Sequence, residues 1–427
     1  MILIYRIITN ILYPLLIFLI YLRKISKKED PVRFKEKIFS SHFRVERKKN
    51  SKLIWFHAAS VGEFKSIVPI IKELINFNKN LEFLITTTTL SSSHLAKEEL
   101  KLINGAYHRF IPIDVDFLIK EFLTLWKPDI IFLVDSEIWP NLILNASERK
   151  IKLGIINARI TEKTFKKWIK IPSSAKKIFG CFDLCLASNL ETKIYLEKLN
   201  VKNVKNSGNI KLINNLLHKK ISDKNFEFLS KENFWLAAST HKGEENLCLE
   251  THLALKKKIK DIVTIIAPRH INRSLEIKKL CDNFDLDTQI LGKDEIILKN
   301  KDIIIINSFG ILSNFYKFAK SVFIGKSMVQ KLKNVGGQSP IEAAQLGCKI
   351  YHGPYVYNFN EIYKLLNLNG ISEKIEDASQ LTDKLLNDFV VLENKKENFS
   401  VLMNNLSQTT LAETMKNINN FVLNAFK

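Results

Sequence analysis

Carboxylates that follow apolar runs are the residues of this chain best suited to acid–base chemistry. Glu63 follows the apolar segment 53–57 after a turn of small residues, and Asp135 and Glu137 directly follow the segment 129–134. A positioned carboxylate can accept the proton of a hydroxyl group as that group attacks. Two carboxylates at the end of a buried strand are costly to desolvate, which favours a functional reason for them. Glu63 has an alternative role as a helix-capping residue, which its position supports equally well.

Cations and glycines follow other apolar runs. Lys211 could neutralise a leaving phosphate, although a lysine in a loop is usually only solvated. Arg269, held after Pro268, could grip a phosphate or carboxylate with two hydrogen bonds. Gly336–Gly337 would allow the backbone to approach a nucleotide closely, and Glu342 beyond it could accept hydrogen bonds from both ribose hydroxyls. These residue types together predict a site for a phosphorylated substrate.

Short apolar runs that alternate with helical patterns must position these residues. The alternation predicts parallel βαβ units with both faces of the sheet covered, so the fold class is α/β. Ligands of such sheets bind at the carboxyl ends of the strands. The predicted helices include 64–77 and 91–102. The predicted strands are 53–57, 81–88, 129–134, 152–156, 234–239, 262–267, 302–306, 321–324 and 348–351.

The pattern indicates two doubly wound domains. It restarts at Phe234 after the polar segment 211–231, which suits a linker, and 427 residues exceed one average domain. Beyond Glu376 the sequence predicts amphipathic helices that pack on the second domain. The predicted division is a membrane anchor at 1–28, a first domain at 29–220 and a second domain at 221–427.

The amino-terminal segment predicts attachment to a membrane. Residues 2–22 are mostly Ile, Leu, Tyr and Phe, a length close to that needed to cross about 30 Å of hydrocarbon as one helix. The heavier positive charge follows the apolar core, which favours an uncleaved anchor with its carboxyl side in the cytoplasm over a signal peptide. Arg6 and Pro14 leave open whether the anchor spans the bilayer or lies in the interface. The flanking cations are Arg23, Lys24, Lys27 and Lys28.

The composition narrows the function classes. A net charge of +21 suits an anionic membrane, a phosphorylated substrate or a nucleic acid. Nucleic acid is the weakest of these partners, because the sequence has no aromatic RNA-binding motif, KH-type loop or zinc knuckle. A hydrophobic fraction of 46% is too low for a protein that crosses the membrane many times. The five cysteines form no zinc-binding pattern and are predicted to be buried thiols in a reducing compartment.

Taken in order, these segments resemble the 3-deoxy-D-manno-octulosonic acid (Kdo) transferase family of lipopolysaccharide synthesis. The resemblance spans nearly the whole chain, beginning with the amino-terminal anchor. The segments that carry it are Ser60-Val-Gly-Glu63, Thr86-Thr-Thr-Thr89, Asp135-Ser-Glu-Ile-Trp-Pro-Asn141, Asn157-Ala-Arg159, Gly208-Asn-Ile-Lys211, Ser239-Thr-His-Lys-Gly-Glu-Glu245, Pro268-Arg-His270, Gly336-Gly337, Pro340-Ile-Glu342 and Gly353-Pro-Tyr-Val-Tyr-Asn-Phe359.

The resemblance implies a GT-B glycosyltransferase fold with two Rossmann-like domains. It implies that Glu63 is the general base, and that Glu137 and Lys211 stabilise the transition state. It further implies transfer of Kdo from CMP-Kdo to lipid IVA on the cytoplasmic face of a bacterial inner membrane, with inversion and without a metal or cofactor. The residues implied to bind CMP are Pro268, Arg269, Gly310, Ile311, Leu312, Ser339, Pro340, Ile341 and Glu342.

Two positions depart from the family pattern. Ile311 stands where the family usually has Glu, so only a backbone contact can be carried over there. Ser339 stands where the family usually has Asn, and its shorter hydroxyl could still cap a helix and meet a phosphate. These changes affect the predicted nucleotide site and leave Glu63, Glu137 and Lys211 as the family has them.

Two other functions remain as alternatives to Kdo transfer. One keeps the GT-B architecture but uses a UDP-sugar donor and a lipid-linked acceptor. The other is a basic protein that binds a membrane surface or a nucleic acid, a function that leaves the carboxylates at the strand ends unexplained. The partners predicted by the main hypothesis are CMP-Kdo, lipid IVA and anionic inner-membrane lipids, with no nucleic acid.

Overall fold

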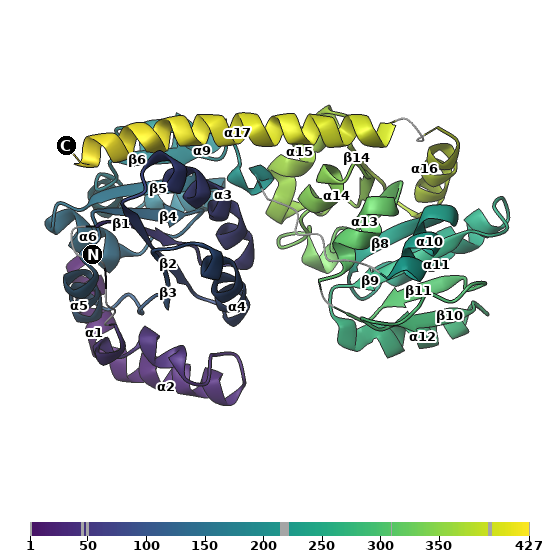
Figure 1. The fold of residues 1–427 in the computed structure, drawn as a ribbon, viewed down its shortest axis with the longest axis horizontal. Coiled ribbons are helices and arrows are strands. Elements are labelled where there is room, and N and C mark those ends of the chain that lie inside the picture. Colours follow the sequence, from purple (N-terminus) through teal and green to yellow (C-terminus); the bar gives the residue numbers. More distant parts are fainter. Residues whose placement is uncertain are drawn as a thin grey trace. The chain divides into compact units, whose positions relative to one another are not determined.

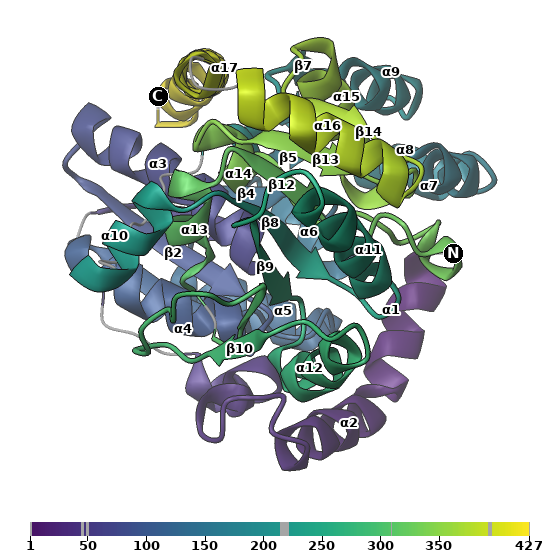
Figure 2. The same cartoon turned by 90° about the vertical axis from the view of Figure 1, so that its right-hand side faces the viewer.

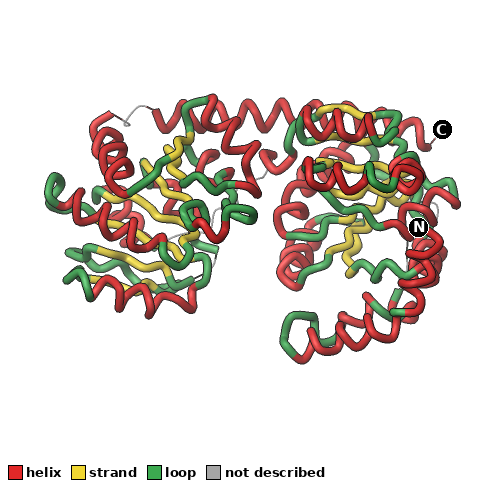
Figure 3. Tube along the Cα trace, turned by 180° about the vertical axis from the view of Figure 1, so that it is seen from behind, coloured by secondary structure: helices red, strands yellow, loops and turns green. Residues whose placement is uncertain are grey.

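The chain folds into two compact α/β units, each built on a seven-stranded sheet (Figures 1 and 3). The computed structural model describes residues 2–43, 47, 51–213, 222–308, 310–391 and 395–426. The first unit contains Met1–Asn215 together with Ser407–Lys427, and the second contains Leu216–Leu406. In both units every paired strand runs parallel to its neighbours, as the strand–helix alternation predicts.

The sheet of the first unit has the strand order β3-β2-β1-β4-β5-β6-β7. Its central strands are apolar along their whole length because helices cover both faces, so successive side chains are buried on either side. The strands are β1 (Lys52–His57), β2 (Leu81–Thr87), β3 (Ala106–Phe110), β4 (Ile130–Val134), β5 (Lys152–Ala158), β6 (Leu184–Ala187) and β7 (Val204–Asn206).

Two groups of helices cover this sheet. One face is covered by α5 (Asp116–Trp126), α6 (Pro140–Glu148), α7 (Glu162–Trp168), α8 (Pro172–Phe179) and α9 (Leu190–Lys198). The other face is covered by α3 (Val61–Phe77), α4 (Leu90–Glu99) and the carboxyl-terminal part of α17 (Lys395–Phe426).

The sheet of the second unit has the strand order β10-β11-β9-β8-β12-β13-β14. Helices α11 (Glu244–Lys256), α12 (Ser274–Asp282) and α16 (Ala378–Val391) share one apolar cluster with its strands (Figure 2). The strands are β8 (Phe234–Thr240), β9 (Val263–Pro268), β10 (Thr288–Leu291), β11 (Ile303–Ile306), β12 (Ser321–Ile324), β13 (Lys349–His352) and β14 (Ser372–Lys374). The remaining helices are α10 (Asp223–Lys231), α13 (Leu312–Phe318), α14 (Ile341–Gln345) and α15 (Asn360–Leu368).

The division of the chain differs in two respects from the sequence-based one. The boundary predicted at residue 220 lies outside the described residues, but residues 223–231 of the predicted linker form helix α10. The end of the chain packs with the first unit, because Ile418 and Val422 of α17 are buried against the strands of that unit. The prediction assigned this end to the second domain because its apolar spacing reveals a buried helix face without revealing its partner.

The amino-terminal segment is a bent pair of helices, where the sequence predicted one helix. Helix α1 (Ile2–Ile11) and helix α2 (Tyr13–Ile25) meet at an angle of 58°. Pro14 lies in the first turn of α2, where its missing N–H does no harm, but it could not continue α1. Over the described ranges, no single helix has the length and apolar composition to cross a membrane, and only the two bent helices together meet that test.

Candidate active site

The strand order of the first unit reverses between β1 and β4, which are neighbours in the sheet. The chain leaves β1 toward β2 on one side, whereas it leaves β4 toward β5 on the other. At such a switch point the two loops diverge and leave a crevice at the carboxyl ends of the strands, where α/β proteins bind ligands. Glu63 follows β1, and Asp135 and Glu137 follow β4, so these three carboxylates lie at the switch point.

Glu63 occupies the first turn of α3 in a capping box. The backbone N–H of Glu63 donates to Ser60 Oγ at 3.4 Å, while Ser60 Oγ donates to Glu63 Oε1 at 2.7 Å. The N–H of Ala59 donates to Glu63 Oε2 at 2.8 Å, and the residue is 9% exposed. The capping role is therefore real, but each carboxylate oxygen retains a further lone pair that a substrate hydroxyl could meet.

The surroundings of Glu63 favour its protonated form. Burial raises the pKa of Glu63 above the ordinary value of 4.5, and the hydrogen bond from Ser60 opposes this rise. The negative charges of Asp135 and Glu137 raise the pKa further. A general base works best when its pKa is close to the working pH, so the direction of this shift suits proton abstraction.

Lys211 is held by Asp135. The ammonium of Lys211 forms an ion pair with Asp135 Oδ2, and the hydroxyl of Ser136 donates to Oδ1 at 3.0 Å. Asp135 has φ +65°, a left-handed conformation that is uncommon outside glycine, and it turns the chain sharply after β4. Asn157 at the end of β5 fixes the loop that carries the lysine, because its Oδ1 accepts the N–H of Ile210 at 3.0 Å.

Glu137 points toward the end of β1. Trp139 Nε1 donates to Glu137 Oε2 at 2.6 Å, and His57 Nε2 lies 3.5 Å from the same oxygen. Three carboxylates, one lysine and one buried histidine thus gather at the switch point. The sequence prediction included Glu63, Glu137 and Lys211 but no role for His57. The only signal for His57 was a polar residue that ends an otherwise apolar strand.

The second unit has a switch point of its own between β8 and β12. Glu244, the first residue of α11, is 1% exposed and fixes the loop after β12. Its carboxylate accepts four backbone N–H groups, from His241, Lys326, Ser327 and Met328, at 2.7–2.9 Å. Burial raises the pKa of Glu244 while these four hydrogen bonds oppose the rise. This carboxylate is fully occupied, so its role is to hold the loop.

The residues predicted to bind CMP lie at the carboxyl ends of three strands in the second unit. Pro268 ends β9, and Arg269 beyond it is exposed. Ile311 precedes α13, which follows β11, and the segment 339–342 enters α14, which follows β12. Helices α13 and α14 contact one another, which brings their loops to the same edge of the sheet. Gly336 is required by space, because a Cβ there would lie 2.2 Å from the carbonyl oxygen of Tyr355.

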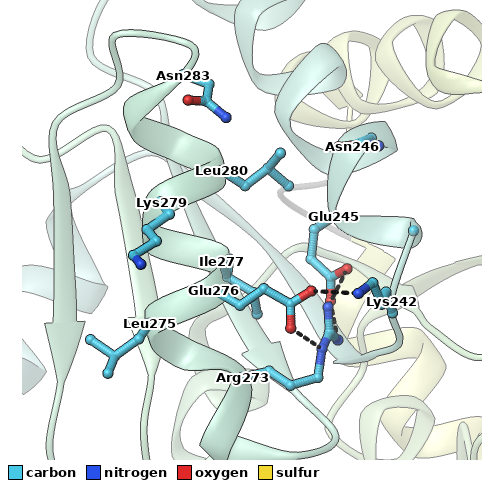
Figure 4. Close-up of a pocket in the computed structure, with 11 residues that line it drawn as sticks. Lys242, Glu245, Asn246, Arg273, Leu275, Glu276, Ile277, Lys279, Leu280 and Asn283 are labelled. Carbon is cyan, nitrogen blue, oxygen red and sulfur yellow. Dashed lines mark hydrogen bonds and ion pairs between the residues drawn. The ribbon is translucent and has the colours of Figure 1, made fainter.

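A cavity of about 550 Å³ lies between α11 and α12 and contains none of the residues predicted to bind CMP (Figure 4). Four of the charged side chains along it pair with one another. Arg273 donates to both oxygens of Glu245 at 2.8 and 3.1 Å, and Glu276 forms ion pairs with Arg273 and Lys242. A smaller cavity of about 210 Å³ includes Ile311, Asn314 and Gly292 in its lining.

Two Asp-x-Asp triplets, a pattern that could hold a cation, have structural partners instead. Asp114 accepts the N–H groups of Asn141 and Leu142 and so caps α6, while Asp116 forms ion pairs with Arg6 and Lys120. The second triplet, 285–287, lies on the approach to β10, where Asp287 pairs with Lys301. All five cysteines are free thiols, and four of them are buried.

Comparison with known proteins decides the family. A family model described as 3-deoxy-D-manno-octulosonic-acid transferase (kdotransferase) matches residues 33–214. A probable mitochondrial 3-deoxy-D-manno-octulosonic acid transferase of Arabidopsis thaliana is 30% identical over 385 residues, which cover 86% of this chain and 84% of the relative. The corresponding transferase of Rickettsia bellii is 30% identical over 390 residues and 89% of both chains. The chain belongs to the Kdo transferase family. The protein is therefore a glycosyltransferase.

Solved structures agree on the fold of this Kdo transferase. A UDP-GlcNAc 2-epimerase from Neisseria meningitidis superposes with a TM-score of 0.58 at 14% identity, over 87% of this chain and all of that one. A glycosyltransferase from Rickettsia africae gives a TM-score of 0.57 at 14% identity, over 87% of this chain and 99% of its own. Two parallel-sheet α/β units that resemble GT-B glycosyltransferases are thus confirmed, as the sequence predicted.

The raised pKa of Glu63 makes its ionisation unfavourable to folding. Below the ordinary carboxyl pKa both the folded and unfolded states are protonated, and the penalty appears as the pH rises through that value toward the folded-state pKa. At pH values above about 6, Glu63→Gln should therefore raise the thermal midpoint of the protein, because it keeps the capping box and removes the charge. The gain in thermal midpoint should shrink as the pH falls toward about 4. Glu73→Gln on the exposed side of α3 is the control. A gain in thermal midpoint that does not change with pH would contradict the raised pKa of Glu63.

Glu244→Ala should destabilise the second unit strongly. The substitution leaves four backbone N–H groups without their acceptor, and one buried unsatisfied donor costs about 1–3 kcal/mol. We expect the free energy of unfolding in urea to fall by about 3 kcal/mol or more. Glu250→Ala on the exposed side of the same helix should change it by less than about 0.5 kcal/mol. Equal effects of the two substitutions would show that the carboxylate does not hold the loop.

Proposed function

We propose that this Kdo transferase moves Kdo from CMP-Kdo to lipid IVA, with inversion at the anomeric carbon and without a metal. Family membership supports the transferred sugar, because the relatives carry the name of that transferase. The observation that carries the mechanism is the buried Glu63 carboxylate at the β1–β4 switch point, with a raised pKa and two further carboxylates beside it.

The transfer is one displacement. Glu63 accepts the proton of a primary hydroxyl on the acceptor disaccharide as the hydroxyl oxygen forms a bond to the anomeric carbon of Kdo. The bond between that carbon and the phosphate oxygen breaks, and its electron pair leaves with CMP. The attack and departure occur on opposite faces of the carbon, so its configuration inverts. Glu137 and Lys211 stabilise the transition state in this proposal.

In this proposal the nucleotide binds to the second unit. Arg269, which is exposed after the buried Pro268, would meet the phosphate, and the backbone of 310–312 would supply contacts that do not need the usual Glu at Ile311. The segment 339–342 offers the Ser339 hydroxyl to the phosphate and the Glu342 carboxylate to the ribose. A leaving group with a single phosphate can be neutralised by a side-chain cation such as Arg269.

We also propose that the helical pair α1–α2 attaches the enzyme to the anionic cytoplasmic face of an inner membrane. Polar side chains of α1 face the protein, since Tyr5 OH donates to Asp114 Oδ2 at 2.9 Å and Arg6 pairs with Glu148 at 2.8 Å. Those contacts favour a pair that lies in the interface, with Arg23 and Lys24 near the headgroups. The apolar side chains on the exposed side are Leu3, Ile4, Ile7, Ile8, Ile11, Leu12, Leu15, Phe18, Leu19, Leu22 and Ile25.

Replacing the proposed base, Glu63, should stop the transfer of Kdo without preventing the binding of CMP. Loss of a general base costs roughly 10²–10⁴-fold in rate, so Glu63→Gln should lower kcat by at least about 100-fold. Transfer is measured by mass spectrometry of lipid IVA incubated with CMP-Kdo. The same variant should still be stabilised by CMP in thermal unfolding, whereas UDP should give no shift. Near-native turnover of Glu63→Gln would refute the role of Glu63 as the general base. Thermal stabilisation by UDP alone would favour a UDP-sugar donor.

Membrane attachment has a separate test. Ile4→Asp with Ile11→Asp places two charges on the exposed apolar side of the helical pair, where the wild-type side chains are 56% and 70% exposed. This variant should no longer float with vesicles that contain phosphatidylglycerol, because a charge is expelled from the acyl boundary. Leu102→Asp, at a position 87% exposed elsewhere on the first unit, should float as the wild type does. Flotation of all three proteins would contradict attachment through α1.

A further inference from the structure

His57 carries a buried ring nitrogen that the proposed mechanism does not yet use. The side chain ends β1 and is wholly buried, at 0% exposure. Its Nε2 has no hydrogen-bond partner among the residues that the structure describes, yet it lies 3.5 Å from Glu137 Oε2. Buried polar atoms are nearly always satisfied, so an orphan nitrogen aimed at a carboxylate of the site requires an explanation.

The other ring nitrogen shows which tautomer faces the carboxylate. Trp55 Nε1 donates to Thr86 Oγ1 at 2.8 Å, and the same hydroxyl lies 3.0 Å from His57 Nδ1. Since the hydroxyl oxygen already accepts the indole N–H, its own proton is available for His57 Nδ1. Nδ1 is then an acceptor, and the proton of the neutral ring is on Nε2, which faces Glu137.

The alternative tautomer is disfavoured at Nε2. From Nδ1 it could donate to the carbonyl oxygen of Thr86 at 3.2 Å, an oxygen that also accepts the N–H of Ala58 at 2.9 Å. However, it would leave a bare lone pair on Nε2 facing the lone pairs of Glu137 Oε2. The repulsion at Nε2 therefore favours the Nε2–H form.

We propose that His57 is the positioning residue for Glu137, held by the Trp55–Thr86 hydrogen bonds so that its Nε2–H points at Glu137 Oε2. Trp139 Nε1 donates to the same oxygen at 2.6 Å, and its ring packs edge-on against His57 with centroids 5.7 Å apart. Two N–H groups from β1 and from the loop after β4 thus converge on one carboxylate oxygen. Together they fix the orientation of Glu137 beside Glu63.

The separation of 3.5 Å is longer than the roughly 2.7–3.2 Å of an ordinary N–H···O hydrogen bond, so the contact is a weak, directed one. The consequence for catalysis rests on the proposed function, since it supposes that Glu137 acts in the transfer of Kdo. The tautomer and the contact do not depend on it.

A matched pair of substitutions tests the role of His57. The amide nitrogen of Gln can take the place of Nε2, whereas that of Asn is too short to reach Glu137 and resembles Nδ1 only. A displacement of a catalytic group by about 1 Å can cost on the order of 100-fold in rate, so His57→Asn should lower kcat by roughly 10- to 100-fold. Its KM for CMP-Kdo should not change, and His57→Gln should recover most of the lost kcat. Wild-type kcat in His57→Asn, or equal losses in both variants, would overturn the proposal.

A second pair of substitutions, at Thr86, tests the same role of His57 if the His57 variants fail to fold. Thr86→Val removes the hydroxyl that fixes the ring and keeps the shape of the side chain, and Thr86→Ser retains the hydroxyl. Thr86→Val should lower kcat in the same direction as His57→Asn, and Thr86→Ser should not. Thermal midpoints of all four variants separate loss of fold from loss of positioning. A full loss of kcat in Thr86→Ser would overturn the proposed hydrogen-bond chain.

A spectroscopic measurement is independent of activity. In protein with ¹⁵N-labelled histidine, the signals that disappear in His57→Gln belong to this ring, and their shifts should show a proton on Nε2 and none on Nδ1. Glu137→Gln should move the Nε2 signal and leave the other histidines unchanged. A proton on Nδ1 would refute the inference even if Kdo transfer were observed. Failure of the wild type to transfer Kdo, with the expected histidine signals, would refute the proposed function alone.

Discussion

The chemistry of this protein depends on a constraint of parallel sheets. Where the connections after two neighbouring strands lead to opposite sides of the sheet, no connection crosses the carboxyl ends of those two strands. This happens once in each unit, between β1 and β4 and between β8 and β12. At both places a helix begins directly after the first strand of the pair, and a buried glutamate lies in its first turn: Glu63 in α3 and Glu244 in α11. Because Glu63 and Glu244 occupy equivalent positions, the difference between their surroundings shows what distinguishes their roles.

The two glutamates differ in how fully their charge is satisfied. Glu244 accepts four backbone N–H groups, which is close to the capacity of a carboxylate, and so it serves as a fixed part of the scaffold. Glu63 has one backbone donor and one hydroxyl donor, and two negative neighbours at its side. Lys211 pairs with Asp135, one of these neighbours, and forms no ion pair with Glu63. An incompletely satisfied carboxylate at an open edge can take up a proton, whereas a saturated one cannot readily do so.

The sequence was most informative where burial on both faces forces a continuous apolar run. The inner strands of each sheet were predicted close to their observed bounds, and the residues after them proved to lie at the switch points. The strands that were missed, β3, β6, β7, β10 and β14, are short, and all but β6 lie at sheet edges, where polar residues interrupt the apolar pattern. Spacing also could not reveal Asp135 as the partner of Lys211, or Glu137 as the neighbour of His57, because those contacts join residues 76 and 80 positions apart.

Helix α17 ties the two halves of the polypeptide together in a way that matters for recombination between related transferases. Its early part belongs to the second unit, while Met415, Ile418 and Val422 complete the apolar interior of the first. A single recombination point between the two units would therefore separate the first sheet from the side chains of α17 that cover one of its faces. Chimaeras that exchange the second unit should therefore require two junctions.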